Sequence, residues 1–151
     1  MAEGDGAIYN EFKETVMEGV FNLATGGDAL YLTLHTSYTP NIDTHDVWSD
    51  VSATEYGSGS GYTAGEDASN LLASQDVTED TTNDRGVFDG TDHTYSSLGP
   101  LTPAAPGHTI MHANLATPVD PLILYWELGT TATNGGDYTL QFGANGIMLL
   151  T

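Results

Sequence analysis

The chain has 151 residues, of which 21 are Asp or Glu and only two are Lys or Arg, so its formal net charge is -19. This balance excludes a nucleic-acid partner and an anionic membrane surface, because both require clustered cations. No cysteine is present, which excludes disulfides and thiolate metal sites. No apolar run approaches the roughly 18 residues of a membrane span, so we expect no membrane insertion.

The near-absence of cations is more informative than the acidity itself. Surplus carboxylates repel one another in dilute buffer and oppose a compact fold. In molar salt the Debye length falls to about 3 Å, and this repulsion is largely screened. A merely acidic protein would keep its lysines, whereas this chain has one, Lys13. The composition therefore favours adaptation to high salt.

The N-terminal region predicts an arm followed by the one clear helix. Residues 1–8 are small, acidic and Gly-rich, and indicate a flexible arm. Residues 10–23 show apolar side chains at helical spacing, with Asn10 as the expected N-cap and a glycine pair, Gly26-Gly27, as the stop. Residues 9–151 are expected to form a single β-rich domain.

Beyond the helix the chain reads as β structure with Gly- and Pro-rich connections. Residues 29–35 (ALYLTLH) alternate, and residues 122–128 (LILYWEL) have the apolar character of a central strand. About eight strands are expected, at spacings typical of such folds. The predicted fold class is mainly β, an antiparallel β-sandwich or small barrel with one N-terminal α-helix. The candidate strands are residues 29–35, 51–56, 71–77, 85–88, 94–98, 108–115, 122–128, 138–142 and 147–151.

No catalytic motif is specific enough to indicate an enzyme. The nearest approach to a nucleophile elbow, residues 57–61 (GSGSG), lies in a Gly/Ser run that could not hold the strained turn. The Gly-rich segment 57–65 has no basic residue nearby to help bind phosphate. We therefore expect no enzyme activity, no catalytic residues and no organic cofactor.

One acidic loop is a candidate site for a structural Ca, Mg or Na ion. Asp43, Asp46 and Asp50 place oxygen ligands close together in the chain, as hard cations prefer. Carboxylates in such loops also cap turns or remain solvated, and both alternatives stay open. Asp80, Asp84 and Asp89 form a weaker candidate of the same kind.

Histidine and tryptophan residues allow two further hypotheses. His108 and His112 could share one face of a predicted strand, as His35 lies on its own strand, and would bind zinc only if they converged with a carboxylate; ordinary half-exposed strand histidines are the simpler interpretation. Trp48, in the acidic loop, is a candidate glycan-binding residue, but it could instead pack on the edge of the core. Trp126 lies in the predicted central strand and is expected to pack.

Short segments toward both ends of the chain form a recognisable set: 7–14 (AIYNEFKE), 37–46 (SYTPNIDTHD), 48–52 (WSDVS), 61–65 (GYTAG), 121–123 (PLI), 137–142 (DYTLQF) and 145–147 (NGI). Together these segments resemble a widespread family of small virion structural proteins of tailed viruses, known as capsid decoration or fibre-like proteins. The resemblance covers about the first 65 and last 35 residues. Residues 93–115 match only loosely, and Glu66-Asp67 stand where such proteins often continue with a Lys-bearing strand.

This resemblance implies a non-enzymatic capsid decoration or vertex (turret) protein, here of a virus infecting a halophilic archaeon. The implied partners are the major capsid protein and further copies of the chain, as a trimer or pentamer, with assembly in the host cytoplasm and final location on the virion. The expected interface is the helix stripe Tyr9, Phe12, Val16 and Val20. A receptor- or glycan-binding spike module that contacts the host cell surface is the alternative, and a tail or neck protein ranks lower.

Overall fold

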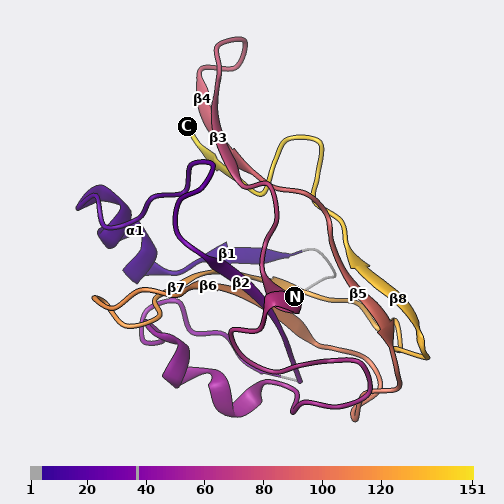
Figure 1. The fold of residues 1–151 in the computed structure, drawn as a ribbon. Coiled ribbons are helices and arrows are strands. Elements are labelled where there is room, and N and C mark those ends of the chain that lie inside the picture. The colour runs from indigo at the N-terminus through magenta and orange to yellow at the C-terminus, as the bar shows by residue number, and fades with distance from the viewer. Residues whose placement is uncertain (1–4, 37) are drawn as a thin grey trace.

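The computed structural model describes residues 5–36 and 38–151 (Figure 1). One α-helix, α1 (Asn10–Met17), and short 3-10 turns accompany the strands. The strands are β1 (Gly6–Ile8), β2 (Leu30–His35), β3 (Asp76–Asp80), β4 (Arg85–Asp89), β5 (His93–Leu98), β6 (His108–Ala113), β7 (Leu122–Glu127), β8 (Gly136–Leu140) and β9 (Met148–Leu150).

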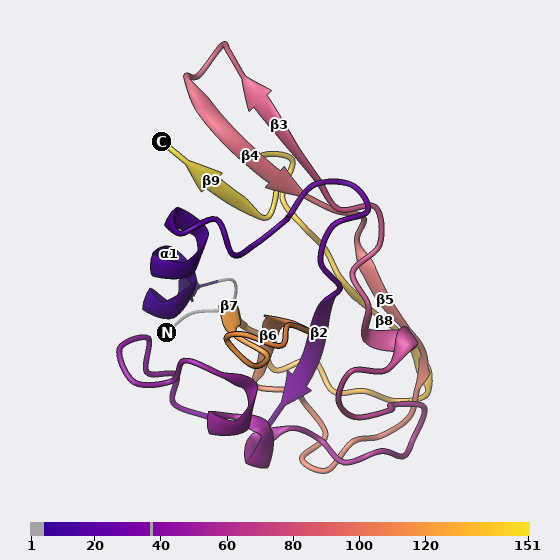
Figure 2. The same cartoon turned by 60° about the vertical axis from the view of Figure 1, so that its left-hand side comes forward.

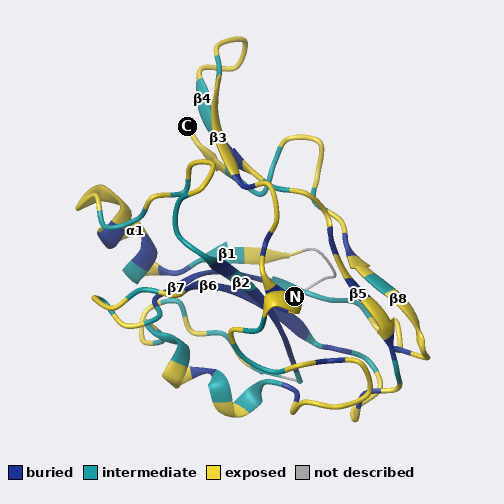
Figure 3. Ribbon diagram, viewed as in Figure 1, coloured by how far each residue is buried: buried dark blue, intermediate teal, exposed yellow. Residues whose placement is uncertain are grey.

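The central sheet contains four antiparallel strands in the order β1-β7-β6-β2. Every residue of β6 is buried, because this strand has neighbours on both sides and both of its faces are covered (Figure 3). In β2 the leucines 30, 32 and 34 point to one face and are fully buried. The alternation in the sequence is the cause, because successive side chains of a strand point to opposite faces.

The two-stranded sheet β5–β8 supplies the second layer over this leucine face. Tyr95 of β5 is buried and donates its hydroxyl to the carbonyl oxygen of Leu32, at 2.7 Å. Leu98 and Leu140 join the same apolar cluster. The opposite face of the central sheet is covered by residues 38–56, here called the covering loop (Figure 2). Val51 of this loop and Ile110 of β6 belong to the same buried apolar cluster.

The third sheet, in the order β3-β4-β9, extends away from these layers (Figures 1 and 2). We call it the projecting sheet. Phe88 and Met148 are cross-strand partners, and both pack against the main core at its base. Four of the five residues of β3 are exposed. The projecting sheet is therefore anchored at one end and solvated at the other.

The mainly β fold class and the helix near the N-terminus are confirmed, with antiparallel sheets in a sandwich-like arrangement. Among the described residues the sheets remain separate rather than closing into a barrel. No helix of the described part is long and apolar enough to cross a membrane.

Several predicted boundaries are wrong. The helix ends at Met17 instead of residue 23, because the chain turns at Gly19 with a positive φ of 75°. Its N-cap is Tyr9 rather than Asn10. Residues 6–8, predicted within the flexible arm, form β1 and pair with β7, whereas residues 1–4 of that arm lie outside the described residues.

Two predicted strands also differ. Residues 51–56 contain a 3-10 helix, η2 (Ser52–Thr54), where a strand was predicted. The strand predicted at 71–77 begins only at Asp76 and continues to Asp80, three residues beyond the predicted end. β3 lacks the apolar alternation by which a strand is predicted, because most of its side chains are exposed to solvent and several are acidic.

Candidate functional site

The three aspartates of the candidate ion site act locally in the covering loop. Asp50 Oδ2 accepts hydrogen bonds from the backbone N–H groups of Asp46 and Val47, at 3.0 and 3.1 Å. Asp43 Oδ1 accepts from Asn10 Nδ2 at 2.6 Å, which ties the loop to the first turn of α1. Two of these carboxylates therefore have the capping and bracing roles that formed the alternative interpretation.

The weaker acidic candidate is likewise divided among local contacts. Asp80 Oδ2 pairs with Arg85 Nε at 2.8 Å, and Asp80 Oδ1 accepts from the backbone of Thr82 and Asn83 in the turn between β3 and β4. Asp89 Oδ1 accepts from the N–H of Gly90. Within the part of the chain that the structure describes, no three His, Asp or Glu side chains converge on one point where a metal ion could bind.

Trp48 packs onto the central sheet. Its indole stacks on the ring of His112, with ring centroids 4.4 Å apart and ring planes inclined by 14°. The centroids of the Trp48 and His35 rings are 5.6 Å apart in a T-shaped arrangement. Stacking on His112 occupies one face of the indole, which weakens the prediction that Trp48 holds a glycan. The packing alternative, with Trp48 at the edge of the core beneath a long loop, describes this contact.

The histidines considered for a zinc site are buried beneath the covering loop. His35 is fully buried, its Nδ1 bonds to Thr54 Oγ1 at 2.9 Å, and its Nε2 bonds to Thr33 Oγ1 at 3.0 Å. His108 Nε2 lies 2.9 Å from Glu127 Oε1 but lacks hydrogen-bond geometry. Both ring nitrogens of His112 are buried without a hydrogen-bond partner among the described residues.

Burial makes His35 and His112 poor bases. It lowers the pKa of His35 to about 3, helped by the neighbouring His112 and His108, and the pKa of His112 to about 4. Each ring is therefore neutral at pH 7. The contacts of His35 are those of a packed core residue: the hydroxyls of Thr33 and Thr54 bond to its ring nitrogens, and the Trp48 ring packs against it.

The predicted helix interface is only partly on the surface. Tyr9 is fully buried, and its hydroxyl bonds to that of Tyr38 at 3.2 Å. Phe12 packs edge-on against Phe21 inside the core. Both side chains are buried within this chain, which weakens the prediction that they form an interface. Val16 is exposed and Val20 is half-buried.

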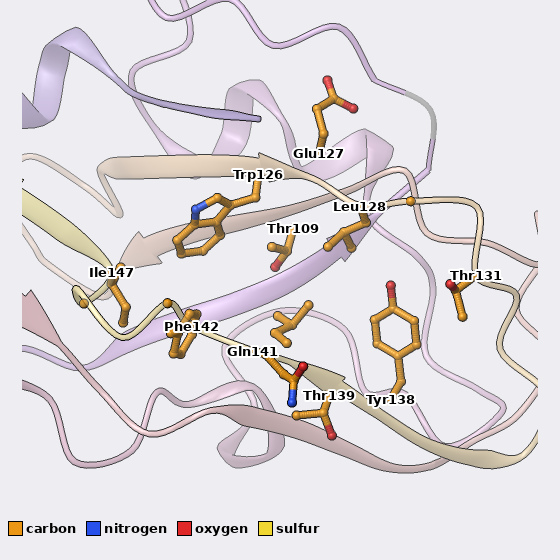
Figure 4. A pocket seen from close by; sticks show the side chains of 14 residues that line it. Thr109, Trp126, Glu127, Leu128, Thr131, Tyr138, Thr139, Gln141, Phe142 and Ile147 are labelled. Atoms are coloured by element: carbon orange, nitrogen blue, oxygen red, sulfur yellow. The ribbon is translucent and has the colours of Figure 1, made fainter. Parts of the chain in front are cut away.

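A cleft of about 440 Å³ lies between β7 and β8 and is here called the β7–β8 cleft (Figure 4); a second hollow, of about 490 Å³, lies along β3 and β4. Trp126 and Leu128 reach the β7–β8 cleft from β7 and its end. Tyr138 and Phe142 reach it from β8 and the segment after it. The strand alternation turns Glu127 away from the gap, and Thr139 and Gln141 point away from Tyr138 and Phe142 (Figure 4).

The rings that line the cleft are only partly covered. Trp126, Tyr138 and Phe142 are all half-buried, and the Trp126 and Phe142 rings are 5.7 Å apart at 39°. Thr109, on the floor, is buried and donates its hydroxyl to the carbonyl oxygen of Thr33 at 3.1 Å. The cleft thus combines a fixed floor with aromatic walls that remain open to solvent.

Sequence reasoning missed this site because it considered Trp126 only as packing. The sequence held one signal. Trp126 and Leu128 are two residues apart and Tyr138 and Phe142 are four apart, so each pair of large side chains lies on one face of its own segment. That β7 faces β8 depends on a pairing of β8 with β5 that the sequence does not specify.

Comparison with known proteins gives no relative. No family model matches the chain, and no curated protein or solved structure is significantly similar to it.

Proposed function

We propose that this protein is a non-enzymatic virion structural protein, a capsid decoration or vertex component of a tailed virus that infects a halophilic archaeon. It works as a homo-oligomer on the major capsid protein and stabilises or ornaments the head. The resemblance of its terminal segments to virion proteins and its 21 acidic against two basic residues support the proposal.

One structural observation carries it: α1 and the projecting sheet expose large apolar side chains. We call Val16, Met17, Val77, Leu149 and Leu150 the assembly surface. Met17 is 81% exposed and Leu150 is 79% exposed, and Leu71 and Val119 are exposed outside these elements. Figures 1 and 2 show where α1 and the projecting sheet lie. Exposed apolar groups of this size gain stability when another molecule covers them.

The edges of the projecting sheet support the same role. β3 and β9 are its outer strands, so each leaves one row of backbone groups unpaired within the sheet. Free strand edges are a liability for a soluble monomer and are covered when copies assemble symmetrically. A tail or neck protein remains the lower-ranked assignment. The spike alternative loses its main support, since Trp48 stacks on His112.

Counting copies in purified virions tests the proposal. Quantitative mass spectrometry should find on the order of tens to hundreds of copies per particle, as symmetric capsid positions require. A number of about three to six would contradict decoration and favour a spike or neck component.

A pair of variants tests the assembly surface. Leu150→Glu should reduce the oligomer measured by sedimentation in molar salt and reduce incorporation into virions, because it adds a charge to an apolar contact. Ala53→Glu, at an exposed position of the covering loop, is the matched control and should assemble normally. Equal assembly of both variants would exclude this surface.

A further inference from the structure

The β7–β8 cleft has two chemically different ends. At one end lie Trp126, Phe142 and Ile147, which form an apolar wall (Figure 4). At the other end the Tyr138 side chain extends toward the segment that carries Thr131 (Figure 4). A ligand that fills the cleft must therefore present a carbon face at one end and groups able to hydrogen-bond at the other.

The size and openness of the cleft suit a small polar ligand. Its volume of about 440 Å³ lies within the roughly 300–1,000 Å³ of typical ligand sites. The aromatic side chains are half-buried rather than enclosed, and Thr131 is exposed. A ligand here keeps one side in water, which disfavours a wholly apolar molecule because its outer face would stay solvated.

Charge excludes anionic ligands. Neither basic residue of the chain lines the cleft: Lys13 lies in α1 and Arg85 in β4, paired with Asp80. Glu127 is the nearest carboxylate along β7, and it points away from the cleft to a position 2.9 Å from His108 Nε2. Without a cation in its lining, the cleft offers no charged partner to a phosphate, sulfate or uronate group, and this holds in molar salt as well.

We propose that the β7–β8 cleft binds a neutral saccharide, with the C–H face of one sugar ring against Trp126 and hydroxyl groups bonded to Tyr138 and Thr131. The electron-rich face of an indole attracts weakly positive C–H groups. Hydroxyl groups of a sugar can both donate to and accept from the Tyr and Thr hydroxyls. This site is additional to the role in the capsid and does not depend on it.

Fluorescence can test the site, because the chain has only two tryptophans. Trp48→Phe keeps an aromatic ring over His112 and leaves Trp126 as the single indole. This variant is titrated in molar NaCl with neutral saccharides (maltose, cellobiose, lactose and di-N-acetylchitobiose), with glucuronate and with free indole. At least one neutral saccharide should change the Trp126 emission saturably, whereas glucuronate should not.

Two threonine variants, made in the Trp48→Phe background, locate the contact. Thr131→Val keeps the shape and removes the hydroxyl, so affinity for the neutral saccharide should fall roughly tenfold, as for one lost hydrogen bond. Thr130→Val is the matched control, since Thr130 is an exposed neighbour that does not line the cleft, and it should bind normally. Circular dichroism melts verify that each variant is folded.

Four results would overturn the proposal. The first is no saturable response to any neutral saccharide in a folded protein. The second is a response to indole alone, which would assign the cleft to an apolar side chain of a neighbouring protein. The third is glucuronate binding as tight as that of the neutral sugars. The fourth is equal weakening by Thr131→Val and Thr130→Val. None of these results bears on the copy number in virions.

Discussion

The central sheet and the projecting sheet differ in burial and in charge: the first is largely buried and apolar, whereas β3 of the second is exposed and acidic. Every residue of β6 is buried, and the leucine face of β2 is fully covered. In β3 four of the five residues are exposed, and the strand contains Asp76, Glu79 and Asp80. The first sheet is held by apolar burial, which salt changes little, while the second places like charges in water, where salt matters most.

The two sheets therefore have different roles in the stability of the protein and in its response to salt. The central sheet gives stability, and the projecting sheet adds surface that needs either salt or a neighbouring molecule. Stability and salt dependence should therefore separate by position in the fold. Four measurements can break or sharpen this distinction.

The largest effect is expected from truncating the core. Leu34→Ala should lower the free energy of unfolding by about 2–5 kcal/mol, because it leaves a cavity at a fully buried position. Leu150→Ala, at a side chain that is 79% exposed, should change it by less than about 0.5 kcal/mol in the monomer. Urea unfolding at constant molar salt measures both. Equal losses of unfolding free energy would mean that Leu150 is as important to the stability of the monomer as a core residue.

The next effect is acid destabilisation through the buried histidines. Burial lowers the pKa of His35 to about 3 and of His112 to about 4, so the unfolded chain takes up their protons first. Their contribution is complete above pH 6.5 and is lost as the pH falls toward the folded pKa values. From pH 6 to pH 5 the loss is about 2 kcal/mol for the two rings.

Urea unfolding between pH 7 and pH 5, in molar salt, checks this expectation. Burial raises the pKa of Glu55 and of Glu66, and these groups act in the opposite direction by favouring the folded state in acid. His112→Gln should flatten the pH dependence and thereby isolate the histidine contribution. A slope that is unchanged in this variant would refute it.

A smaller effect is expected in the covering loop. Asp50→Ala removes the acceptor for two backbone N–H groups and should cost about 1 kcal/mol. Asp50→Asn retains an oxygen acceptor and should cost less. Because the interaction is a cap, the loss should be the same with and without a chelator in thermal melts. A loss that appears only with divalent cations present would restore the ion site.

The smallest effect concerns like charges in the projecting sheet. Asp76 and Asp89 are direct cross-strand partners, and such pairs destabilise by roughly 0.2–1 kcal/mol. Asp76→Asn keeps an oxygen to accept from Thr25 Oγ1 and should stabilise the protein in low salt but not in molar salt. Glu79→Gln is the control, since Glu79 faces Gly86. Melting curves at two salt concentrations distinguish the variants.

The sequence correctly predicted the strands with buried faces, but it misplaced the strand whose residues are mostly exposed to solvent. Residues 29–35 and 122–128 were placed within one residue of β2 (Leu30–His35) and β7 (Leu122–Glu127), because burial requires their apolar patterns. β3 was misplaced because its side chains are mostly acidic and exposed. The helix was overextended because Val20 and Leu23 continue the periodicity beyond the turn at Gly19.

For the candidate site, residue type proved a weaker guide than partner strands. Both tryptophans were considered, but Trp48 was chosen for its acidic loop and Trp126 set aside for its apolar strand. The position of each ring depends on long-range contacts, with His112 under Trp48 and Phe142 beside Trp126. Such contacts follow from the strand order, which one sequence does not specify.

The pairing of β1 with β7 has a consequence for the order in which the protein is made. Gly6 lies against β7 so closely that a Cβ atom there would collide with the carbonyl oxygen of Tyr125. On the ribosome, β1 emerges long before β7 and has no partner in the sheet until residues 122–127 have been translated. Long-range strand pairing of this kind folds slowly. β1 is thus made early but takes its place late, after β7 has been synthesised.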